Sequence, residues 1–210
     1  MFIIIIILKQ EKKLFKMKRL LDCIFSLLIL TLTLPITLII SLLIFCEDGG
    51  PILFKQIRIG KNGKKFNCLK FRTMVINAEE LKEQLMCHNE QDGPVFKIKN
   101  DPRITKIGKF LRKTSLDEFP QFINVLMGDM SIVGPRPAIE CEVNQYNKKT
   151  LKRISVKPGI TCIWQVSGRN NIPFKKWVKM DLYYIENKSL KMDLTIMLKT
   201  IKVIFSGNGQ

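Results

Sequence analysis

The chain has 210 residues, of which 46% are hydrophobic and 25% are charged, so it is neither disordered nor wholly buried in a membrane. Its 35 Lys and Arg residues outnumber 18 acidic residues and give a net charge of +17. This excess predicts an anionic partner, which is a nucleic acid, an anionic lipid headgroup or a phosphorylated substrate. The six cysteines form no Cys-x-x-Cys pair and His88 is the only histidine, which argues against a zinc site, a disulfide framework and a Ser-His-Asp relay.

The N-terminal part of the sequence predicts a short extension followed by a membrane segment. Residues 1–16 are apolar and then basic, and their apolar run is too short to span a bilayer. Residues 23–46 carry no charge and are long enough to cross a membrane as a helix, which Pro35 is expected to bend or break. Because basic residues flank this segment on both sides, a spanning helix and a re-entrant helix that returns to the same face both stay open.

The next segments predict a small α+β domain that is mostly helical. Residues 51–59 and 64–72 alternate apolar and basic side chains around Asn62-Gly63, which is typical of a β-hairpin. Further helices are predicted over residues 75–87, residues 104–113, from about Asp117 to Met127, over residues 174–186 and over residues 190–205. The last helix has an apolar face bordered by lysines, which suits either the membrane surface or packing on the domain's own core.

The most informative stretch joins a basic run to two adjacent carboxylates. Because Pro120 is tolerated in the first turn of a helix, the helix is predicted to begin near Asp117 and to hold Asp117 and Glu118 at its N-terminus. One interpretation is a capping box with Ser115 as the cap and Glu118 three residues later. The chemical interpretation is that one carboxylate attacks a phosphorus atom while the other holds Mg²⁺. Consecutive helical residues point about 100° apart, which suits two separate roles.

Arginines in compact motifs are candidate phosphate ligands. Arg112 directly precedes the acidic pair, and Arg72, Arg136 and Arg169 each lie in a short motif with glycine, proline or small polar neighbours. The planar guanidinium donates two parallel hydrogen bonds to phosphate, and Pro135 and Pro137 stiffen the loop around Arg136. Solvated surface loops are the alternative interpretation of the same motifs.

Taken together, the motifs resemble the bacterial sugar transferase family, the monotopic polyprenyl-phosphate phosphoglycosyl transferases. The resemblance covers roughly residues 17 to 206 and rests on many blocks in order. These blocks are Lys18–Asp22, the proline-interrupted membrane segment, Lys70–Met74, Thr114–Glu118, Gly128–Pro137, Lys157–Thr161, Trp164–Asn170 and Asp181–Tyr184.

The resemblance implies a mechanism and a set of site residues. Asp117 would be the nucleophile that takes a sugar-phosphate from a UDP-sugar and releases UMP, after which polyprenyl phosphate attacks the covalent intermediate. Glu118 would bind Mg²⁺. The residues that would hold phosphates, contact the nucleotide or organise the site are Lys70, Arg72, Arg112, Arg136, Arg169 and Asp181.

The resemblance also implies an organisation and a place in the cell. Residues 1–16 would be an extension, residues 17–48 a re-entrant membrane helix broken at Pro35, and residues 49–210 the catalytic domain on the cytosolic face of the bacterial cytoplasmic membrane. The product would enter capsule, exopolysaccharide or O-antigen synthesis, with downstream glycosyltransferases as possible partners. The sugar and the start at Met1 or Met17 stay open, as does the effect of Cys162, where relatives commonly have Gly.

Two other classes of protein compete with this interpretation. A membrane-tethered nucleic-acid binder would place exposed aromatic side chains among its basic residues, but the thirteen Phe residues fall largely at apolar positions of the predicted elements. We therefore expect no nucleic acid partner. A catalytically idle scaffold of polysaccharide assembly is disfavoured by the intact acidic pair.

Overall fold

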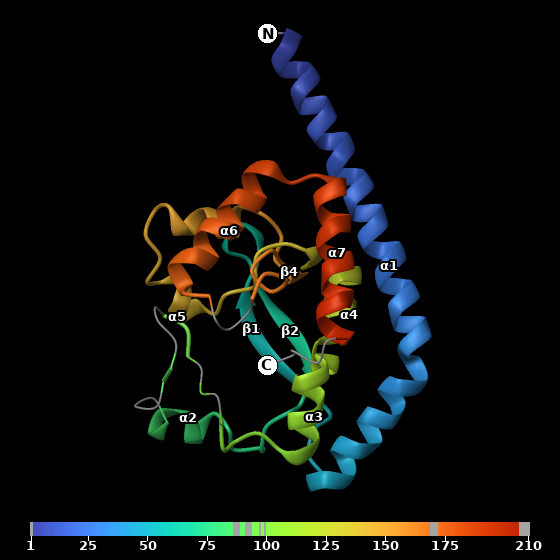
Figure 1. The fold of residues 1–210 in the computed structure, drawn as a ribbon, viewed down its shortest axis with the longest axis vertical. Helices are drawn as coiled ribbons and strands as arrows, with labels where there is room; N and C mark the ends of the chain where they lie inside the picture. Colours follow the sequence, from blue (N-terminus) through green and yellow to red (C-terminus); the bar gives the residue numbers. More distant parts are fainter. Residues whose placement is uncertain are drawn as a thin grey trace.

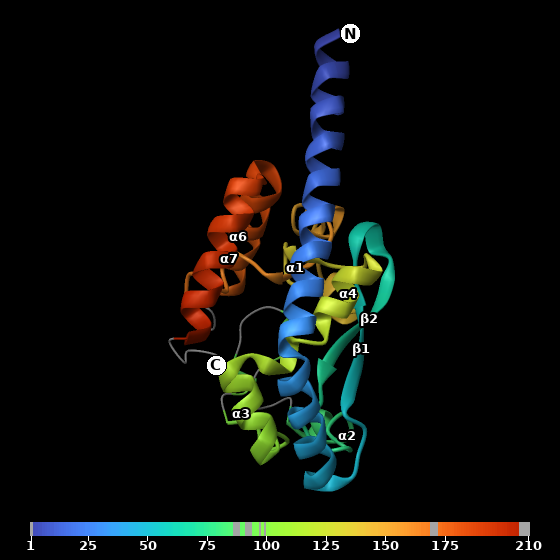
Figure 2. The same ribbon diagram turned by 90° about the vertical axis from the view of Figure 1, so that its right-hand side faces the viewer.

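The computed structural model of the protein describes residues 2–85, 89–90, 94–96, 98, 100–168 and 172–205, and the side chains of residues 2–14, 82 and 205 lie outside this description. One long helix, α1 (Phe2–Asp48), runs along the side of a small α+β domain that is mostly helical (Figure 1). In the view of Figure 2, α1 crosses the face of the domain between α6 and α7 on one side and α4 with the hairpin on the other. The expected α+β class is thereby confirmed.

The domain contains two small sheets surrounded by short helices. Strands β1 (Leu53–Ile59) and β2 (Lys65–Phe71) form an antiparallel hairpin, and β3 (Ser131–Val133) pairs in parallel with β4 (Gly159–Thr161). The helices are α2 (Glu80–Gln84), α3 (Lys106–Thr114), α4 (Gln121–Met127), α5 (Glu140–Val143), α6 (Phe174–Asn187) and α7 (Leu190–Phe205), with 3-10 turns at Lys61–Gly63, Leu116–Glu118 and Thr150–Ser155.

The hairpin forms where the alternating sequence predicted it. Its register pairs Leu53 with Phe71 and Ile59 with Lys65. The connection is a 3-10 turn in which Asn62 and Gly63 take positive φ angles of 57° and 83°. Asn and Gly tolerate this left-handed region better than other residues, which explains why the turn forms at this dipeptide.

A core of apolar side chains joins the hairpin to α4, β3 and the last two helices. Its members with the least exposure are Val125, Met130 and Val133, and Phe25 and Ile29 of α1 pack against the same cluster. At the other end of α1, Ile40 and Ile44 are buried in a separate cluster with Phe71 and Leu111. The core therefore fixes α1 at two levels of the same domain.

The membrane segment was expected to bend or break at Pro35, and α1 continues as one helix through this residue without a break. The helix bends in its C-terminal third, the part that contains Pro35 (Figure 1). The hydroxyls of Thr33 and Thr37 donate to the carbonyl oxygens of Ile29 and Leu34 at 2.7 and 2.8 Å. Hydrogen bonds of this kind, from a Thr hydroxyl to a carbonyl three or four residues earlier, often accompany a bend in a helix.

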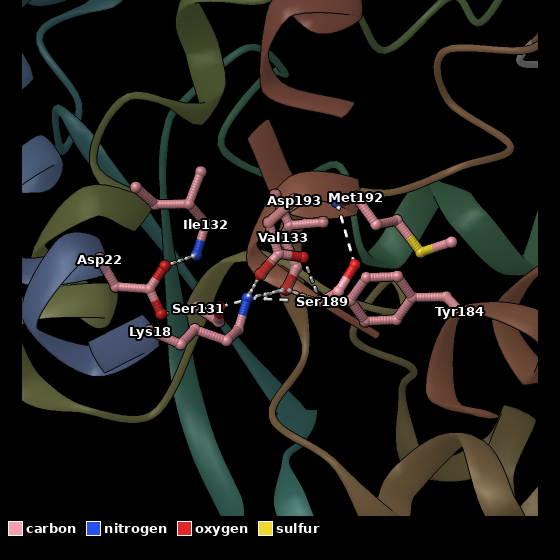
Figure 3. A network of polar contacts seen from close by, with 9 residues as sticks. All are labelled: Lys18, Asp22, Ser131, Ile132, Val133, Tyr184, Ser189, Met192 and Asp193. Carbon is pink, nitrogen blue, oxygen red and sulfur yellow. Dashed lines mark hydrogen bonds and ion pairs between the residues drawn. The ribbon is translucent and has the colours of Figure 1, made fainter. Parts of the chain in front are cut away.

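Polar contacts hold the N-terminal half of α1 to the domain (Figure 3). Asp22 accepts hydrogen bonds from the Ser131 hydroxyl at 2.8 Å and from the Ile132 amide at 3.2 Å. Lys18 pairs with Asp193 of α7 at 2.6 Å and donates to the Val133 carbonyl at 3.1 Å. Near the other end, Asp48 forms an ion pair with Arg72, which leads out of β2. The Lys18–Asp22 block of the sequence thus docks the apolar helix.

Two predicted helices differ from the observed ones. Within residues 75–85, the described part of the helix expected over residues 75–87, an α-helix forms over Glu80–Gln84. Val75 donates its amide to the Arg103 carbonyl at 2.9 Å and so belongs to an extended segment. The helix expected from about Asp117 begins at Gln121. The predicted helices that became α3, α6 and α7 are confirmed within one or two residues at most bounds.

Gly108 allows α3 to lie against the segment that leaves β2. A Cβ atom at this position would lie 2.1 Å from the Thr73 carbonyl oxygen. Because this oxygen belongs to the backbone, the clash could be relieved only by moving the chain. We predict that Gly108→Ala lowers the free energy of unfolding by about 2 kcal/mol or more. Thermal unfolding in detergent measures this, with Lys109→Ala on the exposed side of α3 as the control. Equal stability of the two variants would contradict the close approach.

Candidate active site

A cavity of about 720 Å³ lies between the hairpin, the turn after α3 and the loops around α5 and β4. It brings together six of the residues selected from the sequence: Lys70, Arg72, Arg112, Asp117, Glu118 and Arg136. They come from four separate stretches of the chain, so the fold gathers the predicted motifs into one place. Seven basic and five acidic residues line it, and this excess of positive charge suits a ligand that carries phosphate.

The two carboxylates sit on the 3-10 turn Leu116–Glu118, between α3 and α4. Ser115 ends α3 in a left-handed conformation with φ of 59°, and its side chain makes no cap hydrogen bond to the turn, so the capping box is not formed. Lys70 Nζ lies 2.7 Å from Glu118 Oε1 and 3.9 Å from Asp117 Oδ2. One ammonium group therefore faces both carboxylates.

Burial and charge shift the pKa values of Asp117 and Lys70 for different reasons. Burial raises the pKa of Asp117 to about 6, against the attraction of Lys70, and the neighbouring carboxylate of Glu118 raises it further. Burial alone would lower the pKa of Lys70, but Glu118 and Asp117 together outweigh burial and hold it above its usual value. Lys70 is therefore charged at neutral pH. Asp117, with a pKa of about 6, changes its charge at a pH only slightly below neutral.

Arg112 reaches the cavity from the last turn of α3. Its Nε donates to the Thr73 hydroxyl at 2.9 Å, which fixes the side chain beside the segment after β2. Burial lowers the pKa of its guanidinium while Asp117 raises it. Arg112 is thus positioned by the same close approach that Gly108 allows.

The structure adds Arg58, which the sequence interpretation did not select. Arg58 is buried in the wall of the cavity and donates to the Pro137 carbonyl at 2.9 Å. Its pKa falls to about 10 because of burial and because Arg136 lies near, while Glu142, 3.6 Å from Arg136, opposes the shift. Arg58 pairs in register with the buried Phe66. The predicted hairpin, which places Arg58 opposite Phe66, was the signal available in the sequence, and it does not reveal that Arg58 is buried.

The remaining predicted residues have other surroundings. Arg72 lines the cavity but is engaged by Asp48 and by the Pro51 carbonyl at 2.6 Å. Asp181 is buried outside the cavity lining and accepts from Arg153 Nε at 2.8 Å, and its pKa is raised by that burial. Arg169 lies outside the described residues. The predicted substrate contacts of these three residues stay predictions.

The acidic pair fits one magnesium ion only with the help of a substrate. No cluster of three or more His, Cys, Asp or Glu side chains suited to a metal occurs in the described part of the chain. Mg²⁺ is usually held by one or two carboxylates together with substrate phosphates and water. Glu118, which is about a quarter exposed in the cavity wall, is placed for that role beside Asp117.

Comparison with known proteins gives a consistent match. The family model described as bacterial sugar transferase matches residues 13–207. A galactosyl transferase of Streptococcus agalactiae is 53% identical over 164 residues, which are 78% of this chain and 36% of that protein. A UDP-galactose-lipid carrier transferase of Erwinia amylovora is 46% identical over 92% of this chain and 41% of its own length.

An undecaprenyl-phosphate galactose phosphotransferase of Salmonella typhimurium is 42% identical over 200 residues, 92% of this chain and 41% of its own length. The chain therefore spans about two fifths of the length of these curated relatives.

The raised pKa of Asp117 has a consequence for stability. Folding raises this pKa from its ordinary value near 3.8 to about 6, so the protonated form is favoured and the associated stability is lost as the pH rises through about 6. We predict that Asp117→Asn raises the free energy of unfolding by about 2 kcal/mol at pH 7.5. This gain in stability should disappear near pH 4, where Asp117 of the parent is protonated. Thermal unfolding without added metal tests this, with Asp129→Asn as the control. A gain that is independent of pH would contradict the assignment.

Proposed function

The chain belongs to the bacterial sugar transferase family, and we propose that it transfers a hexose-1-phosphate from a UDP-sugar to polyprenyl phosphate with release of UMP. The observation that carries the proposal is the pair Asp117 and Glu118 in the wall of a basic cavity, beside an apolar helix of membrane-spanning length. A donor with two phosphates and an acceptor embedded in lipid both suit this arrangement.

The first step uses Asp117 as the nucleophile. An oxygen of its carboxylate forms a bond to the phosphorus that carries the sugar, and the bond from that phosphorus to the bridging oxygen breaks. UMP leaves with the bridging oxygen and its electron pair, and the sugar-phosphate stays on Asp117 as an acyl-phosphate. Lys70 keeps the carboxylate oriented and offsets its charge while the anionic donor approaches.

The second step regenerates the carboxylate. An oxygen of polyprenyl phosphate attacks the same phosphorus, the acyl-phosphate bond breaks, and Asp117 is released as a carboxylate with a diphosphate-linked sugar on the lipid. Because UMP leaves before polyprenyl phosphate reacts, the mechanism is ping-pong. The acyl intermediate divides one difficult transfer between two anions into two displacements at one site.

Phosphate charge must be balanced throughout the reaction. Bound at Glu118, Mg²⁺ would neutralise the diphosphate and stabilise the leaving nucleotide phosphate. Arg58, Arg112 and Arg136 stand around the cavity and would hold non-bridging phosphate oxygens through their guanidinium groups.

We propose further that α1 enters the membrane from the cytosolic face and returns to it. Asp22 and Ser26 are buried near one end of the apolar stretch and Ile40 and Ile44 near the other, all against the same domain. The side of α1 that faces away from the domain exposes leucines along its length, with Leu32 and Leu38 both more than 60% exposed. A helix attached to one domain at both ends fits shallow insertion in one leaflet better than a complete crossing.

The acceptor chemistry also suggests the wider role. The relatives named above act on galactose donors and lipid carriers, so we propose a UDP-hexose as the donor and a polyprenyl phosphate such as undecaprenyl phosphate as the acceptor. The lipid-linked product would be the starting point for capsule or exopolysaccharide assembly at the bacterial cytoplasmic membrane, where downstream glycosyltransferases extend it.

UMP release tests the reaction. We expect detergent-solubilised protein with Mg²⁺ and polyprenyl phosphate to release UMP from one member of a panel of UDP-sugars. Asp117→Asn should lower the turnover by about a thousandfold or more, because the nucleophile is lost. Asp129→Asn removes a carboxylate outside the cavity and should keep most of the activity. No release by folded protein with any donor would point to the idle scaffold.

Arg58 offers a test of the cavity's electrostatics. We predict that Arg58→Gln lowers kcat/KM for the UDP-sugar about tenfold or more, mainly through KM, and that Arg58→Lys recovers part of the loss. Lys65→Gln removes one charge from the exposed side of the same hairpin and is the matched control. An unchanged KM in Arg58→Gln would assign Arg58 to the fold alone.

A further inference from the structure

A second, smaller cavity of about 100 Å³ lies where α1 meets the domain near its N-terminal half. It shares no lining residue with the active-site cavity. Lys18, Arg19 and Asp22 of α1 form one wall, and Ser131 and Tyr184 continue the network of Figure 3 behind them.

The charge of this second cavity is strongly unbalanced. Its basic residues are Lys18, Arg19, Lys61, Lys157 and Lys188, and the one carboxylate that lines it is Asp22. That carboxylate already accepts hydrogen bonds from Ser131 and Ile132. The lining therefore carries more positive charge than its one carboxylate can neutralise.

Two of the basic residues are fixed by the protein itself. Lys18 pairs with Asp193, and Arg19 donates to the carbonyl oxygens of Val125 and Leu126 at the end of α4. The amine of Lys157, by contrast, makes no ion pair with a carboxylate among the described residues. A Cβ atom at Gly128 would lie 3.5 Å from both Arg19 Nη2 and Lys157 Nζ, so the two cations converge on one spot.

The convergence of the two cations affects the pKa of Lys157. Burial lowers the pKa of Lys157, and the positive charge of Arg19 lowers it further, against the opposing attraction of Asp22 and Asp129. An anion between the two groups would offset both causes.

The surroundings indicate a lipid as the source of the anion. The α1 residues of its lining, Lys18, Arg19 and Asp22, lie where the sequence of α1 changes from basic to apolar. The exposed apolar residues of this part of the helix are Leu20, Ile24 and Leu27. Phe15 lines the cavity and is 51% exposed, with the Lys61 ammonium 5.4 Å from its ring centroid. A molecule with a phosphate and an acyl chain matches both halves of this surface, since basic pockets beside membrane helices attract anionic headgroups.

We propose that this second cavity binds the phosphodiester headgroup of an anionic phospholipid, with the acyl chains along the exposed apolar side of α1. The headgroup lies between the converging cationic groups of Arg19 and Lys157, and Lys188 of the same lining offers a further contact. Such a lipid fixes the depth at which α1 and the domain sit in the membrane surface.

Binding of short-chain phosphatidylglycerol to the full chain in a neutral detergent tests the proposal. The variant is Lys157→Gln with Lys188→Gln, and the control is Lys175→Gln with Lys176→Gln, which removes the same charge from the start of α6 outside this cavity. Native mass spectrometry counts the bound lipid and a titration gives its Kd. Phosphatidylcholine of the same chain length and inorganic phosphate are measured beside it.

We expect the parent and the control to retain one phosphatidylglycerol and the cavity variant to bind it about tenfold more weakly, with phosphatidylcholine weak throughout. An equal loss in both double variants would assign the attraction to general surface charge and overturn the proposal. Inorganic phosphate that binds as tightly as the lipid and displaces it would overturn the lipid assignment. UMP release is not the readout, so a failed transferase assay leaves this result interpretable.

Discussion

Lys70 reaches from the end of β2 to two carboxylates on the turn between α3 and α4, 2.7 Å from Glu118 and 3.9 Å from Asp117. Two adjacent carboxylates in a partly buried cavity wall repel one another, and this ammonium group supplies the nearest compensation. The hairpin register brings Lys70 to that point, and the contact of Gly108 with Thr73 brings α3 and its following turn to the hairpin. The proposed nucleophile therefore depends on a long-range contact between three separate segments.

The same segments connect the cavity to the membrane helix. Arg72, two residues after Lys70, holds Asp48 at the end of α1, and Phe71 between them packs on Ile40 and Ile44. A change in the position of α1 would thus reach the acidic pair through one short stretch of β2. Under the proposed function, this connection links the membrane helix, where a lipid acceptor would lie, to the cavity that would receive the UDP-sugar.

Local patterns predicted the hairpin and the helices α3, α6 and α7, because alternation, helical spacing and an Asn-Gly turn are encoded within a few residues. The start of α4 was misplaced, since the left-handed Ser115 creates a separate 3-10 turn that a proline rule cannot distinguish from a first helical turn. Six of the residues selected from motifs line one cavity. The ion pairs Arg72–Asp48 and Asp181–Arg153 were not predictable, because each joins positions that are far apart in the chain. Arg58 escaped selection for a similar reason, as its burial depends on the loop at Pro137.

The covalent step on Asp117 is the central claim, and intact-protein mass spectrometry tests it most directly. The protein is incubated with Mg²⁺ and the accepted UDP-sugar in the absence of polyprenyl phosphate, then quenched in acid. We predict a mass gain of one hexose phosphate, mapped to the peptide that contains Asp117, and removal of this mass when polyprenyl phosphate is added. UMP formation that requires the acceptor, with no mass gain and no labelled peptide at any time, would contradict it and indicate direct transfer.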